Sequence, residues 1–600
     1  MFKRSNYRFA VIYIAIIVLV AITYWPVVHG DFVWDDMLDL HDSSWLRVGD
    51  EWKHYIFRGF HYWSNYFRPL GIGLLTLQVR LFNDTPGPMH AVSLAMHLID
   101  TVLVGLLSWI CLTKTTGNGN GKIFIATSML LYGLHPILIE PVAWIGCQFE
   151  LLLTMLILLG LIANLSVRNI YIRAGSVACL FFLAACAKEA AFSFPLLLFI
   201  FDWLLFRRRL GQNTFNNILS VIARNWLVYA TTFLAGMAYL AFRYWALGKI
   251  INPAVVSSLS AFARMQEVCF LYLHYWKTLI WPMGSIGPIH PVDVQQFAII
   301  SPLSLLTDMI AISIVLIGFR LVVSKSSVVG CMLLAVTAAL LPVIHIASVD
   351  FDSSLYHERY AMTALTATLP MLPLVLLRIQ NSGKLSKLGS LVLATAGLFW
   401  LIFAFVNIRA TLPLWSNNVN LWRWAVAQNP GYAEAENGLL VAYIDSHDYA
   451  GAHKLIDTLL LNHVECPSCM ISAAFLAIAE HNTAAAASAL NQVRDSKQVL
   501  VDKKMFAAYL FATGEMLTLQ GNLVDAEGAL RAVVEMDTLS PEPKIALAMT
   551  LALAGKAEEA RQVGDAGIEM LPANERSARQ KALDQVIESV QSKASIKHSH

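Results

Sequence analysis

Long apolar segments separated by short polar ones fill the first 410 residues of the chain. Phe9 to Val28 has 20 consecutive residues without a charge, which is the length that a helix needs to cross a bilayer. The residues after it lack the small-x-small pattern of a signal-peptide cleavage site, so we expect it to remain as the first membrane helix. Ten further segments predict membrane helices: 89–112, 122–135, 150–166, 174–187, 190–206, 226–246, 304–320, 328–346, 361–377 and 389–407.

The basic residues favour this count of eleven crossings. Lys and Arg collect on the cytoplasmic side of membrane spans, and with a cytoplasmic N-terminus every cytoplasmic segment contains at least two of them. An odd number of crossings places the C-terminal region outside. The basic residues concerned are Lys3, Arg4 and Arg8; Lys114 and Lys122; Arg168 and Arg173; Arg207, Arg208, Arg209 and Arg224; Arg320 and Lys325; and Arg378, Lys384 and Lys387.

Segment 269–282 is also apolar, but it has only 14 residues and contains His274 and Lys277. It is short for a membrane span, so we expect an interfacial or re-entrant helix there. If it crossed, the basic clusters that follow it would fall outside.

Composition agrees with a polytopic membrane protein. Hydrophobic residues make up 57% of the 600 residues and charged residues only 14%, against about 25% in soluble domains. The mean hydropathy is +0.57, and a net charge of +2 with scattered basic clusters gives no reason to expect nucleic acid. We therefore predict an all-α fold, a polytopic membrane bundle of about 11 helices followed by a soluble α-solenoid.

The predicted first external loop, residues 29–88, begins near the sequence DFVWDD and is rich in Trp, Tyr and Phe. Aromatic side chains favour the headgroup layer of a bilayer, so the loop could be only an interfacial belt around solvated acids. Asp35 and Asp36 could instead be the acids of an external active site. The residues alone leave both interpretations open.

The long apolar segments end near residue 410, and small residues then recur at a spacing of 34, which is the tetratricopeptide period. We expect about four repeats, with a short insertion around 494–504. Stacked helix pairs form a concave surface suited to a peptide or protein partner, and a rigid lid or a dimerisation arm is the alternative. The recurring pairs are Gly521 and Gly555, Ala526 and Ala560, and Ala452 and Ala486.

Six of the eight cysteines lie in or beside predicted spans, where a thiol usually packs as a small apolar group. Cys466 and Cys469 instead form a C-x-x-C pair in the predicted external region, where an oxidising compartment favours a disulfide. A free pair, or a metal or redox role, is the alternative, although two ligands supply only half of a zinc site.

Four groups of polar residues fall at the predicted external ends of the helices. Charges at this depth are costly unless they are paired or face a wet cavity. They could be ion pairs that fix helix packing, such as Lys188 with Glu189 or Glu140, and Glu358 with Arg359. In one cavity, such carboxylates and cations would suit a reaction in which a phosphate leaves and an acid takes up a proton. The groups are Asp35 and Asp36; Arg68; His135, Glu140 and Glu150; and Lys188, Glu189, His357, Glu358 and Arg359.

The motifs DFVWDD, FRPL, MHAVSLAMH, LHPILIEPVAW, AKEAAFSFP, NP at 252–253 and HERY precede the repeats in this order and cover nearly the whole chain. The ordered set resembles the transmembrane-and-tetratricopeptide-repeat O-mannosyltransferases and their bacterial relatives, within the C-type (GT-C) glycosyltransferase superfamily. The resemblance implies transfer of a sugar from a polyprenyl-phosphate donor to an acceptor on the external face. It also implies that an acid of the first external loop, Asp35 or Asp36, is catalytic.

On this resemblance, one aspartate accepts the proton of the acceptor hydroxyl and the configuration of the sugar inverts. We expect Asp35 in this role, with Asp36 orienting it, and the donor phosphate on Arg359, Lys188 and Arg68. No cofactor or metal is required, although two adjacent acids could hold Mg²⁺ or Mn²⁺. Further cavity candidates are His135, Glu140, Glu189, His357 and Glu358.

The chain departs from the eukaryotic relatives at GCQFE (146–150), at HERYAMT (357–363) and in its short repeat array. These differences concern the sugar and the acceptor more than the reaction class. We expect Ser or Thr of a protein as acceptor, for example a bacterial surface protein or pilin, with the repeats binding a protein acceptor or partner. The rival interpretations are a glycan or lipid acceptor, a transporter of lipid-linked sugars, and a non-catalytic assembly scaffold.

The predicted organisation is a transmembrane glycosyltransferase domain over 1–410, a linker over 411–428, tetratricopeptide repeats over 429–590 and a disordered tail over 591–600. Short loops and few repeats favour a bacterial inner membrane. The N-terminus would then be cytoplasmic and the repeat domain periplasmic.

Overall fold

The structure is a computed structural model, and the part of the chain that it describes contains helices and connecting segments but no strand. Contacts divide the chain into two compact units, which we name the membrane unit and the C-terminal unit. The membrane unit comprises Met1–Asp31, Ile56–Leu74 and Thr85–Ser416, and the C-terminal unit comprises Phe32–Tyr55, Leu75–Asp84 and Asn417–His600. The described residues are 2–37, 40, 46, 51–58, 66–82, 85–116, 121–206, 214–250, 259–282, 286–325, 327–346, 354–383, 386–538, 540–571 and 573–597.

In the described part, eight helical segments are long and apolar enough to cross a membrane. Two more pass only as bent pairs, with angles of 48° between Lys122–Gly133 and Pro136–Ala143 and 75° between Asn216–Arg224 and Trp226–Leu247. Helix α14, Val328–Leu340, has 13 residues, too few to cross the roughly 30 Å of hydrocarbon. The described part of the chain is therefore helical with several candidate membrane-spanning segments, and the count of eleven crossings stays a prediction.

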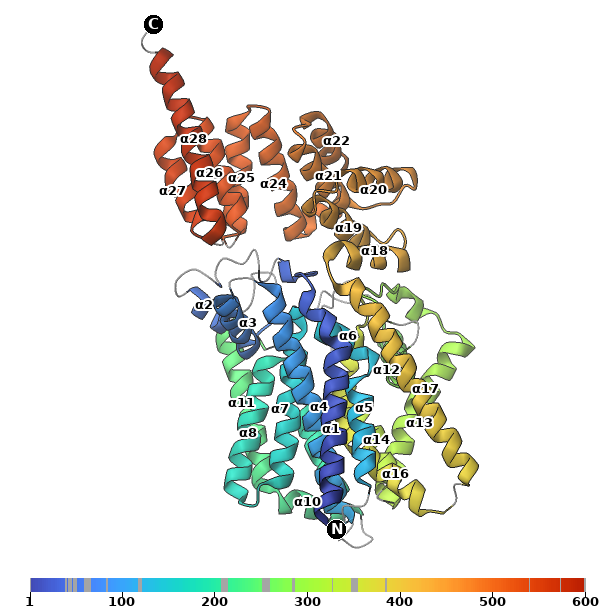
Figure 1. Cartoon of the computed structure of the whole chain (residues 1–600). Helices are drawn as coiled ribbons and strands as arrows, with labels where there is room; N and C mark the ends of the chain where they lie inside the picture. The colour runs from blue at the N-terminus through green and yellow to red at the C-terminus, as the bar shows by residue number, and fades with distance from the viewer. Residues whose placement is uncertain are drawn as a thin grey trace. The chain divides into compact units, whose positions relative to one another are not determined.

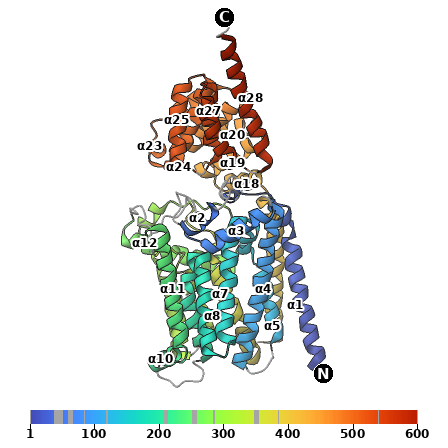
Figure 2. The ribbon, with the colours of Figure 1, turned by 90° about the vertical axis from the view of Figure 1, so that its left-hand side faces the viewer.

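Most of the long helices of the membrane unit run alternately up and down as the chain advances (Figures 1 and 2). We name the end at which α1 finishes and α4 begins the site end, and the opposite end the basic end. The principal helices are α1 Phe2–Tyr24, α4 Pro86–Thr116, α5 Lys122–Gly133, α6 Ile139–Ala143, α7 Gln148–Ser166, α8 Ile170–Ala187, α9 Phe194–Phe206, α10 Thr214–Arg224, α11 Trp226–Leu247, α12 Ala261–Ile280, α13 Pro302–Lys325, α14, α15 Met362–Thr368, α16 Leu372–Asn381 and α17 Lys387–Thr411. The residues of α2 Glu51–Arg58 and α3 Pro69–Phe82 are divided between the two units.

Polar caps explain why several helices begin at the basic end. The Asn169 side chain accepts hydrogen bonds from the backbone N–H groups of Tyr171 and Ile172, at 2.9 and 3.2 Å, and so caps α8. Ser386 caps α17 in the same way, with 3.0 Å from its hydroxyl to the Gly389 nitrogen. Such caps satisfy N–H groups that have no partner inside the helix. They allow short polar turns to separate long apolar helices.

A buried polar network fixes the bend between α10 and α11. Asn225 lies at the bend, and its amide donates to Asp202 Oδ2 at 2.8 Å and to Asn164 Oδ1 at 2.9 Å. Asp202 also accepts from Asn164 at 2.7 Å and from the Tyr229 hydroxyl at 2.6 Å. The carboxylate of Asp202, on α9, therefore ties α7, α9 and α11 together near the basic end.

Helix α12 contains the segment 269–282 and is longer than the sequence suggests. It begins at Ala261 because Ser260 caps it, with 3.2 Å from the hydroxyl to the Ala263 nitrogen. Its first half contacts the start of α13, where Gln266 donates to Ser304 at 3.0 Å. Its last turn accepts a hydrogen bond from His135, after α5, with 3.0 Å between Nε2 and the Leu279 oxygen. Both halves therefore contact the site end, which favours a helix that lies along this end over one that crosses.

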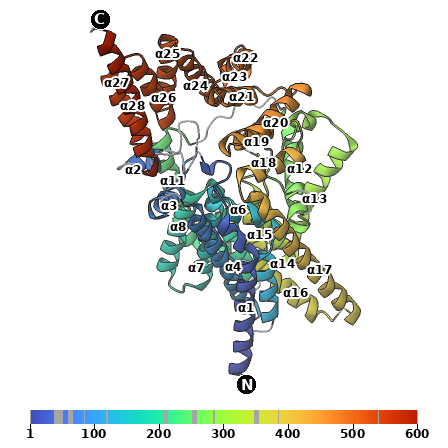
Figure 3. The same cartoon turned by 45° about the horizontal axis from the view of Figure 1, so that its top comes forward.

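The C-terminal unit consists of successive helix pairs (Figure 3). The four pairs are α19 with α20, α21 with α22, α24 with α25, and α26 with α27. The bounds are α18 Asn418–Gln428, α19 Ala433–Asp445, α20 Tyr449–Leu461, α21 Pro467–Ala479, α22 Thr483–Val493, α23 Lys497–Val501, α24 Lys503–Leu519, α25 Leu523–Met536, α26 Pro541–Leu553, α27 Ala557–Ile568 and α28 Ala573–Lys597.

Each pair has the same turn. A residue with positive φ ends the first helix of the pair, and an alanine that is 0% exposed follows five residues later in the second. Each of these residues turns the chain in the left-handed conformation, which is unfavourable for most L residues. These four alanines are the small residues that the sequence pattern singled out. The turn residues are His447, His481, Gly521 and Gly555, and the alanines are Ala452, Ala486, Ala526 and Ala560.

Three predicted boundaries change. The expected linker 411–428 is helical, because α18 begins at Asn418, where the Asn417 side chain caps it. Helix α28 continues to Lys597, into the stretch expected to be a disordered tail. The insertion expected around 494–504 contains the short helix α23.

The segment 32–55, assigned from sequence to the membrane domain, groups with the C-terminal unit. The Trp34 backbone N–H donates to Asn418 Oδ1 at 2.7 Å, and the Trp34 ring lies 5.5 Å from the Trp422 ring. These contacts place the start of the expected first external loop on α18.

Candidate functional site

The centre of the membrane unit's polar network is an ion pair between Glu140 and Arg359. Glu140 lies on α6, which follows a bend after α5, where Pro136 lacks the backbone N–H that a continuing helix needs. Arg359 lies in the one-turn helix Glu358–Ala361 before α15. Both side chains are buried, and the Arg359 guanidinium also lies 5.1 Å from the centre of the Trp144 ring.

Lys188 joins the network between α8 and α9. Its ammonium pairs with Glu150, in the first turn of α7, and lies 4.8 Å from the centre of the Tyr360 ring. The guanidinium of Arg359 lies 5.0 Å from the same ring. Two cations from distant parts of the sequence therefore lie against one aromatic ring, whose face attracts each of them.

Arg68 is the third cation. Its Nε lies 3.1 Å from Glu189 Oε2, and the other oxygen of Glu189 lies 3.1 Å from a terminal nitrogen of Arg243, on α11. The segment that carries Arg68 is fixed by the Tyr239 hydroxyl, which donates to the Phe67 oxygen at 3.1 Å. Glu189 is 33% exposed, so this part of the network is the most accessible.

A row of histidine and tyrosine rings adjoins the Glu140–Arg359 pair. His290 lies 3.0 Å from a carboxylate oxygen of Glu358, and its ring stacks on Tyr356 with 4.5 Å between centroids. His274, on α12, contacts the same tyrosine at 3.8 Å. His357 Nδ1 lies 3.6 Å from Glu140, which connects the row to the ion pair.

The charges set the protonation of these groups. Burial lowers the pKa of His290, but the carboxylates of Glu358 and Glu140 outweigh it and raise the pKa above its ordinary value. Burial, together with the charge of Arg359, holds the pKa of His357 well below that of an ordinary histidine. His290 is therefore the histidine of this row that favours a positive charge, and His357 is neutral.

The cations make this network a candidate phosphate site. It holds four Arg and Lys side chains and four carboxylates, so an incoming phosphodiester, which carries one negative charge, would compete with the carboxylates for the arginines, which offer bidentate contacts. The cations are Arg68, Lys188, Arg243 and Arg359, and the carboxylates are Glu140, Glu150, Glu189 and Glu358.

The structure brings most of the predicted site residues together and leaves His135 outside. The side chain of His135 hydrogen bonds to Leu279 and lies 5.2 Å from the Trp400 ring, so it fixes α12 and α17. Those in the network are Arg68, Glu140, Lys188, Glu189, His357, Glu358 and Arg359.

The pairing differs from the pairs suggested by the sequence. Lys188 pairs with Glu150 instead of Glu189 or Glu140, and Glu358 pairs with a histidine instead of Arg359. Sequence neighbours are poor guides here, because Lys188 and Glu189 belong to different turns and point to different partners.

Sequence reasoning also missed Arg243, His290 and the aromatic partners Trp144 and Tyr360. A signal existed for Arg243, since it is a charge inside the predicted span 226–246. No such signal existed for His290, which lies in a loop between Pro288 and Pro291.

The two aspartates lie in the C-terminal unit. Asp36 is 1% exposed, and its own turn holds it: its N–H donates to the Val33 oxygen at 3.1 Å, and its carboxylate accepts from the Val33 N–H at 3.4 Å. Asp35 is exposed. Trp34, just before them, has a φ of 58°, a conformation that is rare for a bulky residue and typical of functional sites. That the aspartates share a cavity with the cations stays a prediction.

Two further sequence predictions concern the cysteine pair and a metal site. Cys466 and Cys469 form a disulfide at the start of α21, where both are buried. Among the described residues, no group of three or more His, Cys, Asp or Glu side chains is arranged to hold a metal ion.

We compared the chain with known proteins in three ways. No protein-family model, no curated protein and no solved structure matches it.

Proposed function

We propose that this protein is an inverting glycosyltransferase that moves a sugar from a polyprenyl-phosphate donor to an acceptor hydroxyl. The proposed acceptor is Ser or Thr of a protein, on the external face of the membrane. One observation carries the proposal: Arg68, Lys188 and Arg359 are far apart in the sequence, yet they lie in one buried network at the site end. Buried charges inside a membrane protein are costly and usually functional.

In the proposed reaction, the cations hold the donor phosphate while the acceptor oxygen attacks the anomeric carbon. The bond between that carbon and the phosphate oxygen breaks, and the phosphate leaves as an anion held by Arg359 and Lys188. Arg68, whose partner Glu189 is shared with Arg243, has the most room to exchange a carboxylate for a phosphate oxygen. Attack opposite to the leaving group inverts the configuration.

Asp35 is the proposed base that receives the proton of the acceptor hydroxyl. Its exposure suits a group that meets an acceptor, and the buried Asp36 suits a positioning role. The strained Trp34, held on α18, supports the view that this turn is built for a purpose beyond connecting helices.

The disulfide supports the proposed side of the membrane. Disulfides persist in oxidising compartments and are rare in the cytosol, so Cys466–Cys469 favours an external C-terminal unit. A bacterial inner membrane with a periplasmic repeat domain would meet this condition.

The second candidate is a non-catalytic scaffold whose repeats bind a protein partner. The observation in its favour is that Lys188 and Arg359 both already have a carboxylate partner. A buried, fully paired network can serve packing alone.

The test is transfer by the purified protein. It is incubated with polyprenyl-phosphate monosaccharides and with lysate from cells that lack it, and protein masses are then compared by glycopeptide mapping. Transfer should occur, and Asp35→Asn should slow it by about 10²- to 10⁴-fold. Asp36→Asn, made separately, should weaken it less. If no donor supports transfer to protein, glycan or lipid, the transferase proposal is wrong and the non-catalytic scaffold remains as the candidate function.

A further inference from the structure

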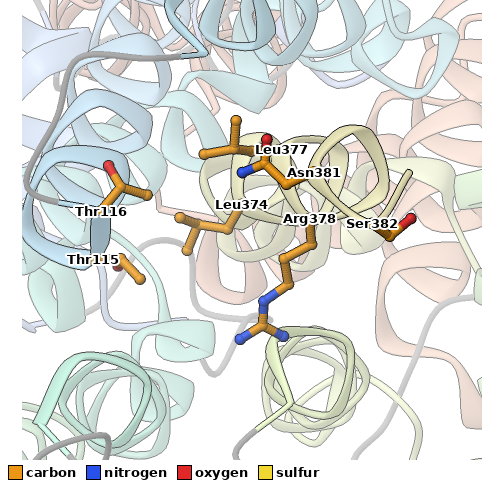
Figure 4. Close-up of a pocket in the computed structure, with 7 residues that line it drawn as sticks. All are labelled: Thr115, Thr116, Leu374, Leu377, Arg378, Asn381 and Ser382. Atoms are coloured by element: carbon orange, nitrogen blue, oxygen red, sulfur yellow. The ribbon is translucent and has the colours of Figure 1, made fainter. Parts of the chain in front are cut away.

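A cavity of about 280 Å³ lies at the basic end, between the last turns of α4 and α16 (Figure 4). Its floor is apolar, since Leu374 and Leu377 are buried, while Arg378 at its edge is exposed. On the scale of liquid water this volume holds about nine molecules, which is room for a polar headgroup. The lining residues are Thr115, Thr116, Leu374, Leu377, Arg378, Asn381 and Ser382.

Arg378 differs from the buried cations of the site end. Among the described residues, its side chain has neither an ion pair nor a hydrogen bond. Besides Arg378, the neighbouring stretches 111–122 and 371–390 contain Lys114, Lys122, Lys384 and Lys387 but no Asp or Glu. A guanidinium without a carboxylate partner, in a region of positive charge, attracts anions and suits the oxygens of a phosphate.

The cavity lies where lipid phosphates are expected. Two membrane-spanning candidates, Pro86–Thr116 and Glu358–Asn381, end at residues that line it. The hydrocarbon layer ends at the ends of such helices and the headgroup layer begins there. A phosphate on Arg378 would leave its acyl chains beside the apolar floor formed by Leu374 and Leu377.

The remaining chemistry selects the headgroup. Both helices end here. Their last carbonyl groups carry a partial negative charge, which opposes an anion, and their oxygens can accept hydrogen bonds from hydroxyl groups. The Thr115 hydroxyl donates to the Cys111 oxygen at 2.6 Å, so towards the cavity it also offers an acceptor. A ligand that fits has one anionic phosphate for Arg378 and hydroxyl groups for these acceptors.

We propose that this cavity binds the headgroup of an anionic glycerophospholipid with a glycerol headgroup, from the membrane leaflet at the basic end. The phosphodiester contacts the Arg378 guanidinium, and the glycerol hydroxyls donate to the acceptors at the ends of α4 and α16. The site lies at the opposite end of the bundle from the charged network and does not depend on the proposed transferase activity.

The experiment uses the full-length protein in nanodiscs of phosphatidylcholine with a minor fraction of phosphatidylglycerol, followed by native mass spectrometry of retained lipid. The protein should retain phosphatidylglycerol over phosphatidylcholine. Arg378→Gln should reduce this retention about tenfold or more, as expected for the loss of a charged bidentate contact. Arg378→Lys should restore part of it.

Arg320→Gln is the matched control. Arg320 is an exposed arginine of α13 that lies near the basic end but outside the cavity. It should leave retention unchanged. Asn381→Asp, which adds a negative charge at the cavity edge, should weaken retention without removing an arginine and guards against a folding defect in the Arg378 variants.

Equal loss in the Arg320 and Arg378 variants would indicate general surface electrostatics and overturn the site. So would full retention in both Arg378→Gln and Asn381→Asp. Competition by millimolar inorganic phosphate as effective as that by phosphatidylglycerol would identify a free-phosphate site and overturn the assignment to lipid.

Discussion

Arg359 and Glu140 combine two possible roles in one contact. A buried ion pair adds little net stability, because desolvation opposes attraction, but removal of one partner leaves an unpaired buried charge. A single substitution therefore confounds folding with function. Neutralising both partners separates the two.

Arg359→Gln alone should destabilise the protein by about 3–5 kcal/mol, because Glu140 keeps its charge without its partner. The double variant Glu140→Gln with Arg359→Gln should recover most of the thermal stability. If Arg359 holds the donor phosphate, the double variant should still lack transferase activity. Unfolding temperature and transfer rate, measured on the same preparations, check this. A stable double variant with the activity of the unchanged protein would assign Arg359 to packing alone.

His290 should make stability depend on pH. Because Glu358 and Glu140 raise its pKa in the folded protein above that of the unfolded chain, the folded state binds this proton more tightly. The contribution is complete below about pH 6.5, the ordinary histidine value, and disappears as the pH rises through the raised value. The unfolding temperature should therefore fall more steeply above neutral pH in the unchanged protein than in His290→Gln. Parallel curves would contradict the prediction.

At the scale of elements, a single carboxylate holds the bend between α10 and α11. Asp202 accepts three hydrogen bonds from Asn164, Asn225 and Tyr229. Asp202→Ala leaves these buried donors without a partner and should cost about 3 kcal/mol or more. The unfolding temperature in detergent measures the loss. Asp495→Ala is the control, because that side chain is 90% exposed and should cost almost nothing.

Two glycines in the pair of α24 and α25 should respond in opposite ways to replacement by alanine. Gly521 ends α24 with a φ of 80°, so Gly521→Ala should destabilise by about 1 kcal/mol. Gly528 lies inside α25, where an added methyl group meets nothing within 4 Å, so Gly528→Ala should stabilise by about 0.5–1 kcal/mol. Hydrogen exchange of α24 and α25 in the full-length protein measures both. Equal effects of the two substitutions would refute the repeated turn as the cause.

At the scale of the whole molecule, the property to test is the topology, that is, the side of the membrane on which each end of the chain lies. Eleven crossings place the N-terminus and the C-terminal unit on opposite faces. A reporter at residue 1 should be cytoplasmic, and one after residue 600 external, with Cys466–Cys469 oxidised in isolated protein. Both reporters on one face would mean an even number of crossings and would contradict the proposed topology. Thiol labelling before and after reduction checks the disulfide independently.

The sequence by itself determined the helical class, the presence of several long apolar helices and the spacing of small residues in the C-terminal pairs. These properties depend on local information: a run of apolar residues must be buried along its own length, and a left-handed turn needs its glycine or a tolerant residue at one position. Gly521 and Ala526 could therefore be recognised from spacing alone.

Only the tertiary structure decided which charges meet. Lys188 pairs with Glu150, Glu189 pairs with Arg68 and Arg243, and His290 pairs with Glu358, across sequence separations of 38 to 121 residues. An ion pair is chosen by which helix ends pack side by side, and no local pattern encodes that choice. The same reason explains why the sequence could name Arg359 as a candidate but could not supply its partner.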